Sequence, residues 1–145
     1  MVVSDIIIKR INTLEQFARN KAKLLTKKRV DIDITIGLKN HTGTGNAMAQ
    51  IRVAGNIDTK KYHYQILIND VAFERLPIDK LKGIILHELS HISDYENVIH
   101  GRTKKECAPH GSEFKKACKT LQVPKEFARA QADIAKPKRR IVKLK

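Results

Sequence analysis

The stretch at residues 83–95, GIILHELSHISDY, constrains the fold more than any other part of the chain. It sets His87 and His91 four residues apart among leucines and isoleucines, with Glu88 directly after the first histidine. On an α-helix, residues four apart stand one turn above each other, with about 5–6 Å between their Cβ atoms. Buried polar side chains need partners, and one divalent cation would satisfy both imidazoles. The stretch therefore predicts a buried helix that carries a metal site.

The pattern supplies two ligands, and a catalytic zinc site usually takes three from the protein and keeps one position open. Glu88 is rotated by about 100° from His87 around the helix. Its carboxylate is therefore better placed to contact a water bound to the metal than to bind the metal itself. In the most compact known arrangement of three zinc ligands, a glycine follows the second histidine by three residues and the third histidine follows it by six. Asp94 and Asn97 stand at those positions here, so this arrangement is excluded. The remaining candidates for a third ligand are His100, Glu106, Cys107, His110 and Glu113.

Among these candidates the sequence favours His110. Pro109 and Gly111 flank it in a turn directly before a predicted helix, and Phe114 would anchor that helix in the core. His100 precedes Gly101 in a predicted connecting loop. There its side chain would face solvent or contact the metal ligands without binding the metal.

Two further roles near the metal stay open. Tyr95, His100 and Arg102 are candidate donors to an oxyanion. Asp94 shares the helix face of His87 and His91, so it either orients a histidine ring or is a solvated acid at the helix end.

Apolar spacing upstream of this helix predicts a mixed α+β chain. Residues 5–25 place apolar side chains three, four and seven apart, which is typical of an amphipathic helix. Residues 31–38 (DIDITIGL) alternate apolar and polar side chains, which predicts a half-buried strand. Residues 48–54 and 62–69 have the composition of two more strands. Because the strands follow one another closely, we expect a small three-stranded antiparallel sheet.

Helices should fill most of the second half of the chain. A short helical turn is expected at residues 70–76. Pro77 and Asp79 are start signals for a long helix over about 78–98, and apolar spacing predicts a further helix near 112–122. We expect an N-terminal helix, the sheet, the helix with the two histidines, a short C-terminal helix and a basic tail.

Length and cysteine content bound the class of protein. A chain of 145 residues is most simply one domain. Two cysteines indicate a reduced, intracellular protein. Neither an export signal nor a run of about 20 apolar residues is visible. We expect a cytoplasmic monomer with no membrane contact.

The charge points to a polyanionic partner. The chain has 29 Lys and Arg against 15 Asp and Glu, a net charge of +14. Such an excess attracts nucleic acid, although it also keeps a basic protein in solution. The tail at 136–145 concentrates basic residues, and its candidate contacts with DNA are Lys136, Lys138, Arg139 and Arg140.

HELSH at residues 87–91 followed by HGSEF at 110–114 resembles the SprT-like (Spartan-type) zinc metalloprotease domain. The resemblance covers roughly residues 6–123 and implies a zincin-like fold with a cleft beside an edge strand, where a peptide lies. It implies zinc held by His87, His91 and His110, with Glu88 as the general base on a zinc-bound water. Members of the family act in DNA repair on proteins bound or crosslinked to DNA.

The chain also departs from that family. Many bacterial members carry a C-terminal zinc ribbon with paired cysteines, and no CxxC pair is present here. We therefore expect a metallopeptidase domain at residues 1–125 and a basic tail at 126–145 that takes over the recruitment of DNA.

Two other functions compete with peptide hydrolysis. One is a nucleic-acid-binding module with a closed, structural zinc site made of His87, His91, His110 and Cys107. The other is a metal-dependent hydrolase whose substrate is not a peptide.

Overall fold

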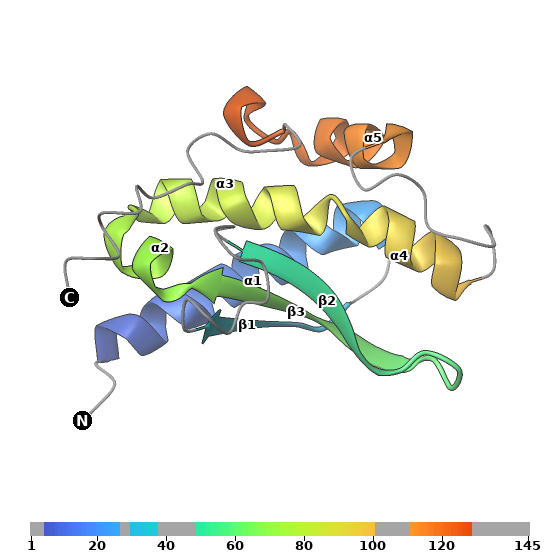
Figure 1. The fold of residues 1–145 in the computed structure, drawn as a ribbon, viewed down its shortest axis with the longest axis horizontal. Coiled ribbons are helices and arrows are strands. Elements are labelled where there is room, and N and C mark those ends of the chain that lie inside the picture. The colour runs from blue at the N-terminus through green and yellow to red at the C-terminus, as the bar shows by residue number, and fades with distance from the viewer. Residues whose placement is uncertain (1–4, 27–29, 38–48, 101–110, 129–145) are drawn as a thin grey trace.

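The computed structural model describes residues 5–26, 30–37, 49–100 and 111–128. The first half holds the helix α1 (Asp5–Thr26) and the strands β1 (Ile32–Gly37), β2 (Ala49–Asn56) and β3 (Lys61–Asn69). The second half holds α2 (Asp70–Arg75), α3 (Ile78–Leu89), α4 (Ile92–Ile99), α5 (Ser112–Leu121) and a short 3-10 turn, η1 (Lys125–Phe127). The fold is α+β, as the sequence predicts (Figure 1).

The expected sheet has three strands, but the predicted antiparallel arrangement is wrong. The strand order is β1-β3-β2, and β3 pairs parallel to β1 and antiparallel to β2. A tight turn joins β2 to β3, so those two strands form the expected hairpin. β3 takes the centre because it is the most deeply buried strand, and Tyr64, Leu67 and Ile68 bury side chains on both of its faces.

The predicted long helix over residues 78–98 is divided in two. α3 ends at Leu89 and α4 begins at Ile92, with Ser90 and His91 between them. The Ser90 hydroxyl donates to the Leu86 carbonyl at 2.9 Å, and the His91 N–H bonds to Glu88, only three residues back. Serine competing for the helix carbonyls in this way tightens the turn locally.

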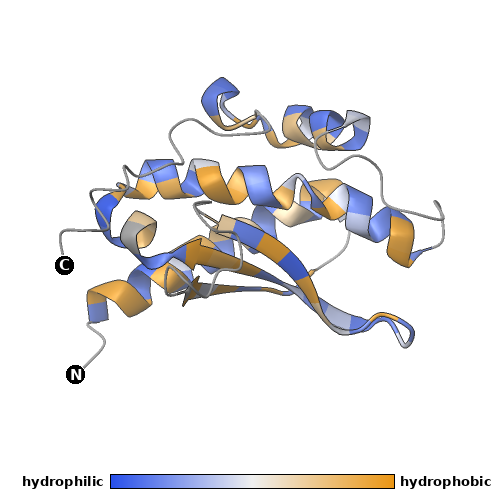
Figure 2. Ribbon diagram, in the orientation of Figure 1, coloured by the Kyte–Doolittle hydropathy of each residue, from blue (hydrophilic) through white to orange (hydrophobic). Residues whose placement is uncertain are grey.

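Two helices cover one face of the sheet. α1 contacts β1 and α3, α3 contacts β2, and α5 packs against α1, α3 and α4. The side chains that β1 turns toward the helices, Ile32 and Ile34, are buried, whereas Asp33 and Thr35 on its other face are exposed. Apolar residues run along α3 and along the strands beneath it (Figure 2).

None of the described helices is both long enough and apolar enough to cross a membrane.

Candidate metal centre

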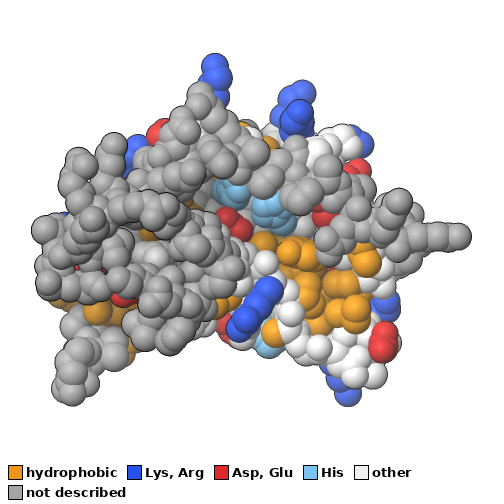
Figure 3. Space-filling model, viewed as in Figure 1, with side chains coloured by type: hydrophobic (Ala, Val, Ile, Leu, Met, Phe, Trp, Pro, Cys, Tyr) orange, Lys and Arg blue, Asp and Glu red, His pale blue; other side chains and the backbone are white. Residues whose placement is uncertain are grey.

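The structure brings His87, Glu88 and His91 together where α3 meets α4. His87 and Glu88 lie in the last turn of α3, and His91 is the N-cap residue of α4. Ser90 and His91 keep right-handed helical backbone angles, so the two histidines remain one turn apart. Their ring centroids are 5.4 Å apart and their planes are inclined by 72°. Histidine and acidic side chains lie in a hollow of this face beside an apolar surface (Figure 3).

The Glu88 carboxyl group is removed from solvent. Its side chain is buried, and this burial raises its pKa from the ordinary 4.5 to about 8. Desolvation disfavours the charged form of a carboxyl group, and a cation nearby favours it. A carboxyl whose pKa lies near neutrality is suited to exchange protons with a reacting group.

The imidazole of His87 is oriented by a residue far along the chain. Its Nδ1 lies 2.7 Å from the backbone carbonyl oxygen of Phe127, and the contact is buried. A carbonyl can only accept a hydrogen bond, so Nδ1 carries the proton and the lone pair is on Nε2. This is the tautomer that binds a metal through Nε2.

Phe114 on α5 forms a wall against both rings. Its ring centroid is 5.0 Å from that of His87 and 4.7 Å from that of His91. The side chain is 1% exposed, which confirms the expectation that Phe114 anchors α5 in the core. Because α5 begins at Ser112, this contact holds the start of the helix beside the histidine pair.

These side chains suit a divalent metal, and the described residues would offer two ligands to it, His87 and His91. The donor atoms are imidazole nitrogens, one of them with its tautomer set by a hydrogen bond, beside a buried carboxyl group. Within the described part of the chain, no group of three potential ligands occurs. The favoured third ligand, His110, lies outside the described residues, as do Glu106 and Cys107.

The other candidate ligands point elsewhere. The Nε2 atom of His100 lies 3.3 Å from Oε1 of Glu96, and Glu113 lies 3.8 Å from the ammonium group of the exposed Lys116. Neither contact involves the histidine pair.

Of the three candidate oxyanion donors, the structure describes Tyr95 and His100. The Tyr95 hydroxyl donates to the Ile51 carbonyl of β2 at 3.3 Å, and Arg102 lies outside the described residues. Asp94 is buried in α4, so the alternative that it is a solvated acid is wrong.

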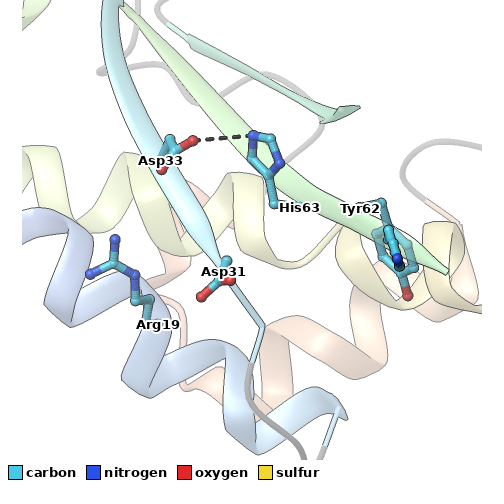
Figure 4. A pocket seen from close by; sticks show the side chains of 6 residues that line it. Arg19, Asp31, Asp33, Tyr62 and His63 are labelled. Carbon is cyan, nitrogen blue, oxygen red and sulfur yellow. Dashed lines mark ion pairs between the residues drawn. The ribbon is translucent and has the colours of Figure 1, made fainter. Parts of the chain in front are cut away.

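The candidate nucleic-acid contacts, Lys136, Lys138, Arg139 and Arg140, lie outside the described residues. The described surface also has an open pocket on the sheet, lined by Arg19, Asp31, Asp33, Lys61, Tyr62 and His63 (Figure 4). An ion pair joins His63 to Asp33 at 3.1 Å, and Asp33 is half exposed. Mixed charges and an ion pair open to solvent favour an ordinary polar surface here.

Sequence reasoning missed two residues of the site, Phe127 and Gly83. Phe127 lies two residues beyond the predicted domain boundary, yet it is 2% exposed and contacts both α3 and His87. Its contribution to His87 is a backbone carbonyl, which every residue has, so no side-chain pattern could reveal it. Gly83 carried a weak signal, because a glycine inside a buried helix usually has a packing reason.

A comparison with protein families matches the SprT-like family over residues 10–135. No curated protein and no solved structure matches the chain. The family match begins within α1 and spans the sheet, the histidine pair and η1. Because it covers most of the 145 residues, the chain belongs to the SprT-like family, which is of the metallopeptidase type.

Proposed function

We propose that this protein is a zinc-dependent endopeptidase in which His87, His91 and His110 hold the metal and Glu88 is the general base. The observation that carries the proposal is the meeting of two imidazoles, with centroids 5.4 Å apart, and a buried carboxyl group at one helix end. Membership of the SprT-like family, which is usually associated with zinc, supports it.

Each residue has a separate task in peptide hydrolysis. When bound, zinc supplies Lewis acidity, which acidifies water and polarises a carbonyl oxygen. Glu88 accepts a proton from the attacking water and donates it to the nitrogen of the leaving amine. His87 and His91 bind through nitrogen lone pairs, and Phe114 excludes water from one side of their rings.

The peptide substrate would lie along β2. In the described part of the sheet, β2 pairs only with β3 and is therefore an edge strand. It contacts α3 directly, and the Tyr95 hydroxyl of α4 reaches its Ile51 carbonyl. An extended peptide can add to such an edge through backbone hydrogen bonds.

We also propose DNA as a partner, with proteins bound or crosslinked to DNA as the substrates. The net charge of +14 supports a polyanionic partner. Within the described residues, α5 presents three exposed lysines to solvent: Lys115, Lys116 and Lys119.

Replacing Glu88 by glutamine tests the assigned chemistry. Glutamine has nearly the same shape but cannot accept the proton, so we expect proteolysis to fall by about 10²–10⁴-fold, the usual contribution of a general base. Zinc content, measured by elemental analysis, should stay at the wild-type level. The matched control is Glu74→Gln, an exposed glutamate on α2 that should leave both values unchanged. Full proteolysis by Glu88→Gln would contradict the role of general base.

Metal analysis of single variants identifies the third ligand. Zinc should be lost in His110→Ala and retained in Glu113→Ala, because Glu113 pairs with a surface lysine. Cobalt substitution separates the closed structural site from the open one. A thiolate ligand from Cys107 would add a charge-transfer band, and the all-histidine site has none. That band would favour the nucleic-acid-binding module.

A further inference from the structure

The turn that follows α5 returns the chain to α3. Within η1, the Phe127 N–H donates to the Pro124 carbonyl at 2.8 Å, and the Ala128 N–H donates to the Lys125 carbonyl at 3.2 Å. These bonds close a tight turn whose last residue, Phe127, is 2% exposed. η1 packs directly on α3, the helix that carries His87.

The ring of Phe127 occupies a notch that exists because residue 83 is glycine. A Cβ atom at Gly83 would stand 2.3 Å from Cε2 of Phe127 and 2.5 Å from Cδ2. Carbon atoms that are not bonded do not approach so closely, so any larger residue would displace the ring. Gly83 therefore sets where Phe127 rests on the helix.

The backbone carbonyl of the same residue reaches the next turn of α3. Gly83 and His87 are four residues apart and thus lie on one face of the helix, one turn apart. Phe127 contacts both of them, with its ring at Gly83 and its carbonyl oxygen 2.7 Å from Nδ1 of His87. Both contacts come from one residue, so displacing the ring should also move the carbonyl.

We propose that Phe127 is a positioning residue of the metal centre. Its ring docks at Gly83, and its carbonyl holds the Nδ1–H tautomer of His87, which presents Nε2 as the ligand atom. The role in metal binding rests on the proposed function, whereas the effect on the tautomer does not. The turn after α5 thus belongs to the site, although the predicted domain boundary falls at residue 125.

The test measures zinc affinity and the His87 tautomer in the full-length chain. Zinc dissociation constants come from competition with a chelator, and the tautomer comes from ¹⁵N shifts of the ring nitrogens in metal-free protein. In Phe127→Ala we expect a mixture of tautomers and zinc binding weakened by about 10–100-fold, as for loss of a partner that orients a metal ligand. Phe127→Leu keeps apolar bulk at the notch and should recover most of the affinity.

Gly83→Ala tests the same contact from the side of α3, because the added methyl group would displace the Phe127 ring. Alanine favours a helix more than glycine does, so a weaker helix would not explain a loss of zinc affinity in this variant. We expect it to show the same mixture of tautomers as Phe127→Ala. The matched control is Phe73→Ala, which removes a buried ring that lies against the guanidinium group of Arg10. It should keep wild-type zinc affinity and the Nδ1–H tautomer at a temperature where every variant is folded.

Three results would overturn the proposal. The first is an unchanged Nδ1–H tautomer in Phe127→Ala, and the second is unchanged zinc affinity in that variant. The third is an equal loss of zinc affinity in Phe73→Ala, which would indicate a general effect on the fold. A wild-type protein that binds no zinc would refute the proposed function and the metal-binding role together. The tautomer measurement would still decide whether Phe127 orients His87.

Discussion

Phe114 shows how one apolar side chain serves both the core and the site. It is 1% exposed and lies against the rings of His87 and His91. A flat aromatic neighbour restricts the rotation of both imidazoles without using a nitrogen atom. Phe114 therefore complements the carbonyl of Phe127, which accepts a hydrogen bond from His87.

Shortening Phe114 should affect stability and metal binding separately. Phe114→Ala leaves a cavity and is expected to cost about 3–5 kcal/mol of unfolding free energy, measured by urea denaturation of metal-free protein. Phe114→Leu should cost less and weaken zinc binding by about threefold to tenfold, below the typical effect of losing a hydrogen-bonding partner. Phe73→Leu is the control for a buried phenylalanine away from the histidines. Identical zinc affinities in the two leucine variants would show that the ring contacts do not matter.

At the scale of elements, a buried carboxylate joins α4 to β3. Oε2 of Glu96 accepts hydrogen bonds from the hydroxyls of Tyr62 at 2.7 Å and Tyr64 at 2.6 Å. Burial is the largest cause that raises the pKa of both hydroxyls, followed by the bond to Glu96, so both remain donors across the physiological range. These bonds fix α4, whose N-cap is His91, against the central strand.

Removing this carboxylate should destabilise the fold. Glu96→Ala leaves the buried Tyr64 hydroxyl and the partly buried Tyr62 hydroxyl without their acceptor. We expect a loss of about 2–4 kcal/mol, given 1.5–3 kcal/mol for a typical hydrogen bond to a charged group. Urea unfolding of the metal-free protein measures it. Glu126→Ala removes an exposed glutamate whose ion pair with Lys80 is solvent-screened, and it should cost under about 1 kcal/mol. Equal losses in the two variants would mean that the tyrosine bonds do not hold α4.

At the scale of the whole molecule, the net charge of +14 leads to a prediction about DNA. Binding should weaken steeply with salt, because each phosphate contact contributes about −0.9 to the slope of log K against log [salt]. If the tail makes contacts, Arg139→Gln/Arg140→Gln should reduce that slope by up to about 2. Fluorescence anisotropy with a labelled duplex measures it.

A matched variant separates local contacts from the overall field. Lys9→Gln/Lys23→Gln removes the same two charges from exposed positions of α1 and should change the slope less. Equal changes would assign the effect to net charge alone. Binding and proteolysis that ignore both salt and DNA would remove nucleic acid from the proposed function.

Local sequence predicted much of the fold, because helices and strand alternation depend on neighbours along the chain. α1, β1, α2 and α5 lie close to their predicted positions. The break at Ser90 and the pairing of β3 with β1 were missed. Turn signals determine which strands form a hairpin. The strand that pairs with the other edge of the central strand depends instead on how the core packs, which local sequence does not show.

The amino-acid sequence by itself determined the family, the α+β class and the helical spacing of His87, Glu88 and His91, because backbone hydrogen bonds in a helix join residues four apart. Only the tertiary structure decided that Phe114 lies against both imidazoles. It alone decided that Phe127, forty residues away, sets the tautomer of His87. This contact depends on a backbone carbonyl and on a ring that packs at Gly83. Packing between residues so far apart in the chain leaves no local sequence pattern.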